Sequence, residues 1–424
     1  MSLDLYTFDS ILNALCPQCS ANKPLSKQVC LNGHCGPSCT GHHEDKQRNK
    51  TLAALCLTSR SLNELATRHL YHRPLCSRWP LLARTLIARP DLGHQVKHLS
   101  TREWDPDASP VPDEVKARWE ELFPESGAEE WHANNILQFC VSLCPRVEEV
   151  DALLGFEEFS HIEVPPLAEV RTVALAYADT EMGLDLIPQA PLGVATPNLE
   201  TLMAHQVSSC ERVGGASTDT KHLRLDWSSI TEESLTDLLT PCPRLLSFRY
   251  TAADATVSDE VQFSPREAQD ALVRLVPGLR SLRMDLCDAI FFEGVTGDDW
   301  LMRDLTGLAR LESLTLEKGC ILPARNRHVG GFAEVEVGPV GDMVLVDLLP
   351  ASIRELRVES VPGGADVAGL IPGLLELGDI ASARFPQLSL VEVSGANVTQ
   401  LEACRHVFES AGVQFRVCPQ PDQE

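Results

Sequence analysis

One six-residue pattern repeats along the chain and constrains its fold more than any other feature. The pattern is apolar-x-x-apolar-x-apolar, and it begins at Val170, Leu199, Thr220, Leu245, Leu279, Leu311, Ile353 and Leu388, with weaker copies at Val96 and Val147. Its alternating end predicts a short strand at each position. The spacers between the copies are long enough to hold a helix, so the chain is expected to alternate strand and helix.

Several spacers carry helix signals of their own. Ser264 is a predicted N-cap, followed by Pro265 at the first helical position and Glu267 three residues after the cap. Residues 231–243 and 397–412 place apolar side chains at helical spacing, and the second segment ends at Gly412, a predicted C-cap. Strand–helix units of about 20 to 40 residues predict an irregular leucine-rich repeat solenoid over residues 76–424, with a parallel sheet on the concave side and helices outside. An ordinary α/β sandwich would not repeat one pattern so often.

Charge is distributed unevenly along the 424 residues, whose net charge is -24. Residues 1–100 hold 12 Lys and Arg against 6 Asp and Glu, a balance of +6, so the remainder carries -30. Such an acidic body repels phosphates, and we expect no nucleic-acid partner. The N-terminus lacks the features of a secretory signal, and no apolar run approaches a membrane span. These features predict a cytoplasmic or nuclear protein without a membrane partner.

Residues 1–75 are expected to form a small helical head of three short helices. Apolar side chains at helical spacing mark the three faces, in residues 8–15, 52–56 and 62–70. Ser59 can cap the third helix and Pro74 ends it. Three short helices cannot bury all of these faces among themselves. The head is therefore either a cap for the repeats or a docking module whose apolar face is covered by a partner.

Two parts of the N-terminal region resemble an F-box of the fungal type. Residues 3–15, LDLYTFDSILNAL, are similar to the first F-box helix, and residues 51–74, TLAALCLTSRSLNELATRHLYHRP, are similar to its second half, with the resemblance continuing through 81–100. Irregular leucine-rich repeats are also found behind F-boxes. The resemblance implies that the head binds a Skp-type adaptor, and through it a cullin ubiquitin ligase. The positions that it assigns to the adaptor contact or its support are Leu5, Ile11, Leu12, Leu52, Leu55, Leu57, Leu62 and Leu65.

The same resemblance implies a function for the whole chain. It would be the non-catalytic substrate-recognition subunit of a Skp–cullin–F-box ubiquitin ligase, in which the repeats bind an unknown protein substrate. Two alternatives stay open. The chain could be a free-standing leucine-rich repeat scaffold for protein binding, or its N-terminus could act as a zinc-binding Cys/His module.

A cysteine-rich insert, residues 16–49, separates the first helix of the head from the second. Five of the 15 cysteines lie between Cys16 and Cys39. Cys16-x2-Cys19 and Cys30-x4-Cys35 have the spacing of two ligand pairs around one tetrahedral zinc ion. A polar, glycine-containing segment has little core, so a metal would be its natural organiser. The alternative is an insert with loose thiols and no chemistry, and no other cofactor is expected.

No catalytic motif is present. The sequence lacks a P-loop, a GxSxG elbow, an HExxH zinc motif and a dinucleotide fingerprint, so we expect no enzyme activity and no catalytic residues.

Two insertions interrupt the regular spacing of the repeats. Residues 101–131 are acidic and proline-rich with an expected helix in 113–123, and residues 323–342 are expected to form a long loop beside the binding face.

The strands offer a candidate substrate-binding face. Because side chains alternate along a strand, the residue between the last two apolar positions should point to the concave surface. That position is occupied by Arg224, Arg249, Arg283, Thr315 and Arg357, and the position after the last apolar residue by Asp226, Thr251, Asp285, Glu317 and Glu359. Neighbouring strands lie about 4.8 Å apart, so an arginine row should run beside a carboxylate row. The two rows either neutralise each other or bind a partner of complementary charge, such as an acidic or phosphorylated segment.

Overall fold

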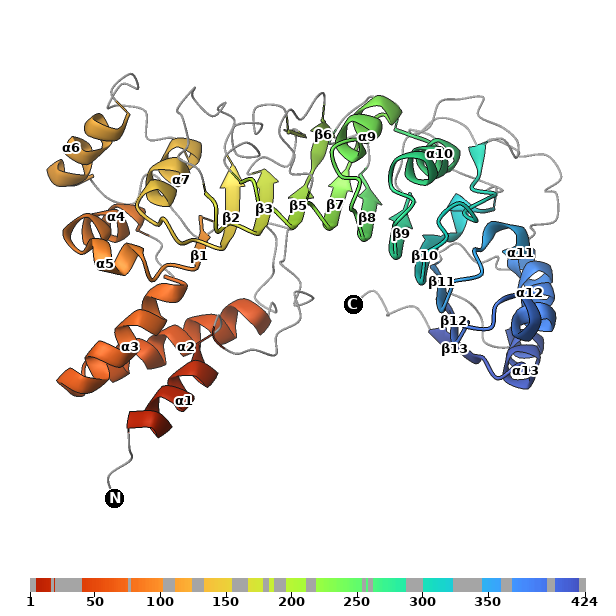
Figure 1. The fold of residues 1–424 in the computed structure, drawn as a ribbon, viewed down its shortest axis with the longest axis horizontal. Coiled ribbons are helices and arrows are strands. Elements are labelled where there is room, and N and C mark those ends of the chain that lie inside the picture. Colours follow the sequence, from red (N-terminus) through yellow and green to blue (C-terminus); the bar gives the residue numbers. More distant parts are fainter. Residues whose placement is uncertain are drawn as a thin grey trace. The chain divides into compact units, whose positions relative to one another are not determined.

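The structure is a computed structural model, and the part of the chain that it describes falls into two compact units (Figure 1). Unit 1 comprises residues 1–179 and 188–205, and unit 2 comprises residues 180–187 and 206–424. The described residues are 5–16, 19, 40–74, 78–101, 111–123, 133–154, 167–177, 183–186, 196–210, 219–253, 257, 262–286, 300–322, 345–359, 368–394 and 401–418.

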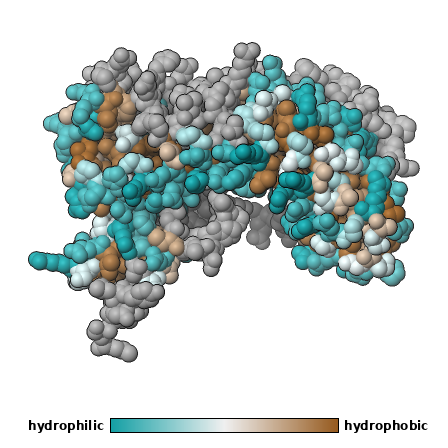
Figure 2. Space-filling model, viewed as in Figure 1, coloured by the Kyte–Doolittle hydropathy of each residue, from teal (hydrophilic) through white to brown (hydrophobic). Residues whose placement is uncertain are grey.

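Unit 1 begins with the helical head, as expected from the apolar spacing. Its three helices are α1 (Leu5–Leu15), α2 (Thr40–Cys56) and α3 (Arg60–His72). Leu12, Leu52 and Ala66, one from each helix, form the buried centre of the head. The predicted cap at Ser59 is confirmed, because its side chain accepts a hydrogen bond from the Leu62 amide at 3.2 Å. Figure 2 shows a small hydrophobic patch, in brown, among hydrophilic residues on the visible face of these helices.

The boundary of the cysteine-rich insert differs from the expected one. We expected an insert through residue 49, but the backbone is helical from Thr40, so residues 40–49 are the first turns of α2. The sequence of this stretch is rich in Glu, Lys, Gln and Arg, which favour helix even where no apolar face marks it. Periodicity alone therefore placed the start of α2 too late. The candidate ligands Cys30 and Cys35 lie outside the described residues.

The rest of unit 1 combines helices with parallel strands. The helices are α4 (Trp79–Ala88), α5 (Pro90–Gly93), α6 (Asp113–Leu122) and α7 (Ala133–Ser142), and the strands are β1 (His98–Ser100), β2 (Glu149–Leu154), β3 (Thr172–Tyr177) and β5 (Thr201–His205). Leu99, Val150, Val173 and Leu202 stand in register on the four strands. Helix α6 confirms the helix expected in 113–123, and its Trp119 ring lies 5.3 Å from that of Phe139. Residues 102–110 and 124–132 of this insertion lie outside the described part.

Unit 2 contains seven parallel strands whose order in the sheet follows their order in the chain. They are β7 (His222–Ser228), β8 (Ser247–Ala252), β9 (Ser281–Asp285), β10 (Ser313–Glu317), β11 (Glu355–Glu359), β12 (Leu390–Ser394) and β13 (Gln414–Cys418). One apolar position of each strand stands in register with the next, in the series Leu223, Phe248, Leu282, Leu314, Leu356, Val391 and Phe415. All seven of these side chains are buried. The unit also holds a short pair of strands, β4 (Leu184–Asp185) and β6 (Val207–Ser209).

The helices of unit 2 lie along one side of its strands (Figure 1). They are α9 (Glu232–Leu239), α10 (Pro265–Leu275), α11 (Leu345–Leu348), α12 (Ile371–Arg384) and α13 (Glu402–Ser410), with the 3-10 turns η2 (Lys318–Cys320) and η3 (Ala368–Leu370). The capping box predicted at Ser264 is present, because its side chain and that of Glu267 each bond the other's backbone amide. Gly412 has a φ of 77° after α13, which is the left-handed conformation that a C-cap glycine supplies.

The repeat pattern predicted the strands well. Each of its copies, including the weaker ones at Val96 and Val147, falls on a parallel strand. The mixed α/β architecture with a large parallel sheet is compatible with a leucine-rich repeat fold. Strand β13 was missed, because Val413, Phe415 and Val417 alternate without the leading apolar-x-x spacing. Residues 323–342, the expected loop, lie outside the described part.

Candidate functional site

Four arginines stand at one register position of unit 2. Arg224 is paired with Arg249, and Arg249 with Arg283, on β7, β8 and β9. Thr315 on β10 follows, and it is paired in turn with Arg357 on β11. We call these four arginines the arginine row. The predicted alignment is therefore present, while the role of the row in substrate binding stays a prediction.

Asp226 holds the first two members of the row. Its carboxylate accepts a hydrogen bond from Arg224 and lies 3.1 Å from Nε of Arg249. The Asp226 side chain is only 10% exposed, while Arg224 and Arg249 are 23% and 34% exposed, so water screens these ion pairs in part. Burial lowers the pKa of Arg249, and the neighbouring Asp226 opposes that shift. The Arg249 guanidinium remains charged at neutral pH, because arginine titrates far above it.

The other two arginines also have carboxylate neighbours. Arg283 Nη2 donates to Glu359 at 3.0 Å. The Arg283 side chain therefore reaches from β9 past β10, where Thr315 stands at the same register position, to β11. Arg357 Nη2 donates to Glu355 on its own strand at 3.3 Å. The charge neutralisation that we considered from the sequence is thus real. Each guanidinium carries five N–H donors in a planar fork, so one carboxylate does not exhaust an arginine.

The stems of the row are anchored while the charged ends stay accessible. The Nε atoms of Arg283 and Arg357 are buried and have no hydrogen-bond partner among the residues that the structure describes. The side chains as a whole are 40% and 42% exposed, so their outer ends reach solvent. Arginine commonly packs its stem on apolar surface in this way. The row is therefore held in place before any partner arrives.

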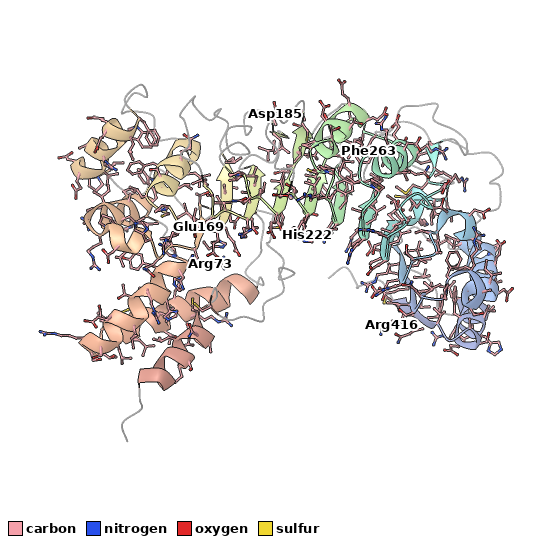
Figure 3. The ribbon with its side chains drawn as sticks, in the orientation of Figure 1. Arg73, Glu169, Asp185, His222, Phe263 and Arg416 are labelled. Atoms are coloured by element: carbon pink, nitrogen blue, oxygen red, sulfur yellow. The ribbon has the colours of Figure 1, made fainter. Side chains whose placement is uncertain are left out.

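Short hydroxyl side chains flank the arginine row on one side. Ser247, Ser281 and Ser313 stand in register on β8, β9 and β10, two residues before the arginine position. His222 occupies the same position on β7 and is labelled in Figure 3. Beyond Arg357, the register position of the arginine row continues to Glu392 on β12 and then to Arg416 on β13, which Figure 3 also labels. The three serines are half-buried and carry short polar side chains next to the arginine row.

The sequence analysis missed a further feature of β7, Trp227. The register of β7 against β8 shifts between Leu225 and Ser228, and inside this irregularity Trp227 has a φ of 52°. Its side chain is 37% exposed, directly after Asp226. Left-handed backbone is unfavourable for a bulky residue, and such strained residues cluster at functional sites. This partly exposed tryptophan directly follows Asp226, which pairs with Arg224 and Arg249, and tryptophan and arginine are residue types that dominate protein-binding hot spots.

The apolar positions assigned to the adaptor differ in exposure. Leu12 and Leu52 belong to the buried centre of the head and can only support a contact. Leu55 and Leu65 are half-buried against that centre, and Leu62 is half-buried too. Ile11 and Leu57 are 43% and 88% exposed and are available to a partner. The side chain of Leu5 lies outside the described part.

Two of the predicted zinc ligands meet histidines that the sequence analysis did not consider. Cys16 follows α1, and His69 and His72 lie in the last turn of α3. Cys19 Sγ lies 3.2 Å from His72 Nδ1 and 3.5 Å from His69 Nδ1, and Cys16 Sγ lies 3.4 Å from His72 Nδ1. The sequence did contain a signal for this cluster, in the spacing Cys16-x2-Cys19 and His69-x2-His72. Burial, and then the neighbouring His69, lower the pKa of His72 to about 4, so its imidazole is neutral at neutral pH.

The buried thiols elsewhere are of a different kind. Cys140, Cys144, Cys210, Cys242 and Cys320 are buried. Burial raises the pKa of Cys144 to about 12 and that of Cys242 to about 11. Protonated buried thiols behave as small apolar side chains. Within the described residues, Cys16, Cys19, His69 and His72 are the group whose ligand atoms all lie within 4.8 Å of one another.

Comparisons with known proteins give no family. No protein-family model matches the chain, and no curated protein matches it. Among solved structures, a match is the crystal structure of a TLR13–ssRNA13 complex, with 11% identity and a TM-score of 0.31. The match covers 77% of this chain and 55% of that one, and at this score it carries no argument. None of the helices that the structure describes is both long and apolar enough to cross a membrane.

Proposed function

We propose that the protein is the substrate-recognition subunit of a Skp–cullin–F-box ubiquitin ligase. In this proposal the head binds a Skp-type adaptor, and a leucine-rich repeat solenoid formed by the parallel strands binds a protein substrate. The observation that carries the recognition role is the arginine row, in which two members share Asp226. The adaptor role rests on the resemblance of the head to a fungal-type F-box and on the apolar side chains that its helices leave exposed.

Energetics favour recognition over stability as the reason for the row. Partly exposed ion pairs contribute about 0–1 kcal/mol each to the stability of a fold, so stability alone is a weak reason to align four cations. Guanidiniums in a fixed row bind carboxylates or phosphates of a partner with directed, charge-assisted hydrogen bonds. An acidic protein segment is the partner chemistry that fits this face. Salt should weaken its binding, because exposed charges are screened over about 8–10 Å.

Replacing Ile11 and Leu57 together by Asp is expected to weaken adaptor binding by about 100-fold or more. Both side chains are exposed, so the charges oppose docking without entering the core of the head. The stronger variant Leu55→Asp/Leu62→Asp should abolish binding, but Leu55 packs against the head's core and this pair can also loosen it. Calorimetric titration of the purified chain with purified adaptor measures both.

The control is Leu81→Asp, on α4 outside the head, where the side chain is 37% exposed. It should bind adaptor as the wild type does. If the folded Ile11→Asp/Leu57→Asp variant bound the adaptor with unchanged affinity, the proposed adaptor role of the head would be wrong. The protein would then be interpreted as a free-standing protein-binding scaffold. Wild-type protein that does not bind the adaptor at all would lead to the same conclusion.

A further inference from the structure

The ends of two helices of the head meet around four metal-ligating side chains. Helix α1 ends at Leu15 and is followed by Cys16, whose amide donates to the Leu12 carbonyl. His69 and His72 are three residues apart in α3, so they project from the same face of the helix. Arg73, labelled in Figure 3, marks the end of α3 and bonds Asn49 of α2 through its carbonyl. All three helices of the head therefore converge here.

The spacing of the ligand atoms fits one tetrahedral zinc ion. Zinc binds thiolate sulfur at about 2.3 Å and imidazole nitrogen at about 2.0–2.1 Å, which sets a sulfur–nitrogen separation of about 3.6 Å. Three of the four sulfur–nitrogen distances in the cluster are 3.2, 3.4 and 3.5 Å. All four ligand atoms lie within 4.8 Å of one another, so a small adjustment brings them around one ion.

We propose that Cys16, Cys19, His69 and His72 bind a structural zinc ion that fixes the end of α1 to the end of α3. Zn²⁺ with two thiolates and two neutral imidazoles has no net charge, which suits a site where Cys16 and His69 are 0% and 2% exposed. Binding releases the two thiol protons, while each imidazole uses its Nδ1 lone pair and keeps the proton on Nε2. With four protein ligands the site is closed, as structural zinc sites are.

This set of ligands replaces half of the set suggested by cysteine spacing alone. Cys16 and Cys19 are common to both, whereas His69 and His72 take the places of Cys30 and Cys35. The zinc would close the start of the cysteine-rich insert against α3 and leave the later cysteines of the insert out of the site. The inference does not rest on the proposed ligase role, since it concerns the folding of the head.

The same four side chains have a competing explanation without metal. Thiols and imidazoles at 3.2–3.5 Å can form ordinary hydrogen bonds in a buried polar cluster. The two explanations differ in stoichiometry and in ligand identity. A hydrogen-bonded cluster holds no metal, and a four-cysteine site depends on Cys30 and Cys35 but not on the histidines.

Metal content of the purified full-length protein tests the inference. Elemental analysis should find about one zinc per chain, and His72→Gln and Cys16→Ser should each reduce it below about one tenth. Cys30→Ser/Cys35→Ser should keep the full zinc content, as should the control Cys56→Ser, a half-buried head thiol outside the cluster. Circular dichroism shows whether each variant is folded, and His72→Gln is the gentler change because that imidazole is only half-buried.

Cobalt substitution gives a second measurement that does not depend on any variant. Wild-type protein stripped of zinc and loaded with Co²⁺ should show visible bands of a tetrahedral site, with sulfur-to-metal absorption from two thiolates. That absorption should be unchanged in Cys30→Ser/Cys35→Ser. Zinc and cobalt that fail to bind the wild-type chain would overturn the inference. Full metal content in His72→Gln, or its loss in Cys30→Ser/Cys35→Ser, would also overturn it.

Discussion

Replacing Phe248 by alanine is expected to lower the free energy of unfolding by about 3–5 kcal/mol. Phe248 is fully buried in β8, in register with Leu223 of β7 and Leu282 of β9. Its removal leaves a cavity between strands that are fixed on both sides, so the surrounding side chains cannot close it completely. Urea unfolding followed by circular dichroism should show the transition that contains unit 2 at a clearly lower denaturant concentration.

Phe248→Leu provides the control for this prediction. Leucine keeps most of the apolar volume at the same position, and the expected cost is about 1.5 kcal/mol or less. If the alanine and leucine variants unfold at the same urea concentration, the side chains around Phe248 do not form a close-packed core. The repeat pattern would then not be what holds unit 2 together.

Replacing Asp226 by alanine is expected to cost about 1–3 kcal/mol, which is large for a single ion-pair residue. The Asp226 carboxylate serves both Arg224 and Arg249, whose side chains are 23% and 34% exposed. Its removal leaves two half-buried cations beside each other without their common anion. Because the arginines are not fully buried, water screens part of the penalty, and the cost stays below that of a fully buried pair.

Asp347→Ala is the matched control for Asp226→Ala. Asp347 pairs with Arg384 at 3.3 Å, where the two side chains are 67% and 45% exposed. Loss of such an exposed pair should cost about 1 kcal/mol or less. Equal costs for the two aspartates, measured by urea unfolding, would mean that Asp226 does not organise the arginine row.

Much of the fold follows from local patterns in the sequence. The apolar-x-x-apolar-x-apolar copies predicted the strands because each copy carries its own alternation, and Ser264 and Gly412 predicted helix ends because caps act within a few residues. The arginine row followed too, since register between parallel strands carries one position of each repeat onto the next.

The features that the sequence did not predict depend mostly on packing between distant segments. Cys19 and His69 are 50 residues apart, and only the packing of α1 against α3 brings them together. The β7 irregularity at Trp227 has no residue such as glycine to mark it. The sharing of Asp226 between two arginines includes a contact between neighbouring strands, which the local pattern of one repeat does not contain. Helix α2 begins ahead of its apolar face, where propensity rather than periodicity determines the structure.

The carboxylates beside the arginine row determine which substitutions can test its role in binding. Reversing Arg249 or Arg283 to Glu would place a new carboxylate beside Asp226 or Glu359, and the repulsion would confuse loss of binding with loss of fold. Neutral Arg249→Gln/Arg283→Gln removes the two charges and leaves Asp226 paired with Arg224. Arg266→Gln/Arg384→Gln removes the same charge from α10 and α12, and serves as the matched control.

The most direct test of the recognition role is quantitative affinity purification of the tagged full chain from cells, comparing adaptor and captured partner in one experiment. In the Arg249→Gln/Arg283→Gln variant we expect partner capture to fall by about tenfold or more, because two charge-assisted contacts are lost. Adaptor capture should stay at the wild-type level, and the Arg266→Gln/Arg384→Gln control should keep both. Undiminished capture of the partner by the folded Arg249→Gln/Arg283→Gln variant would show that the arginine row is not the recognition surface.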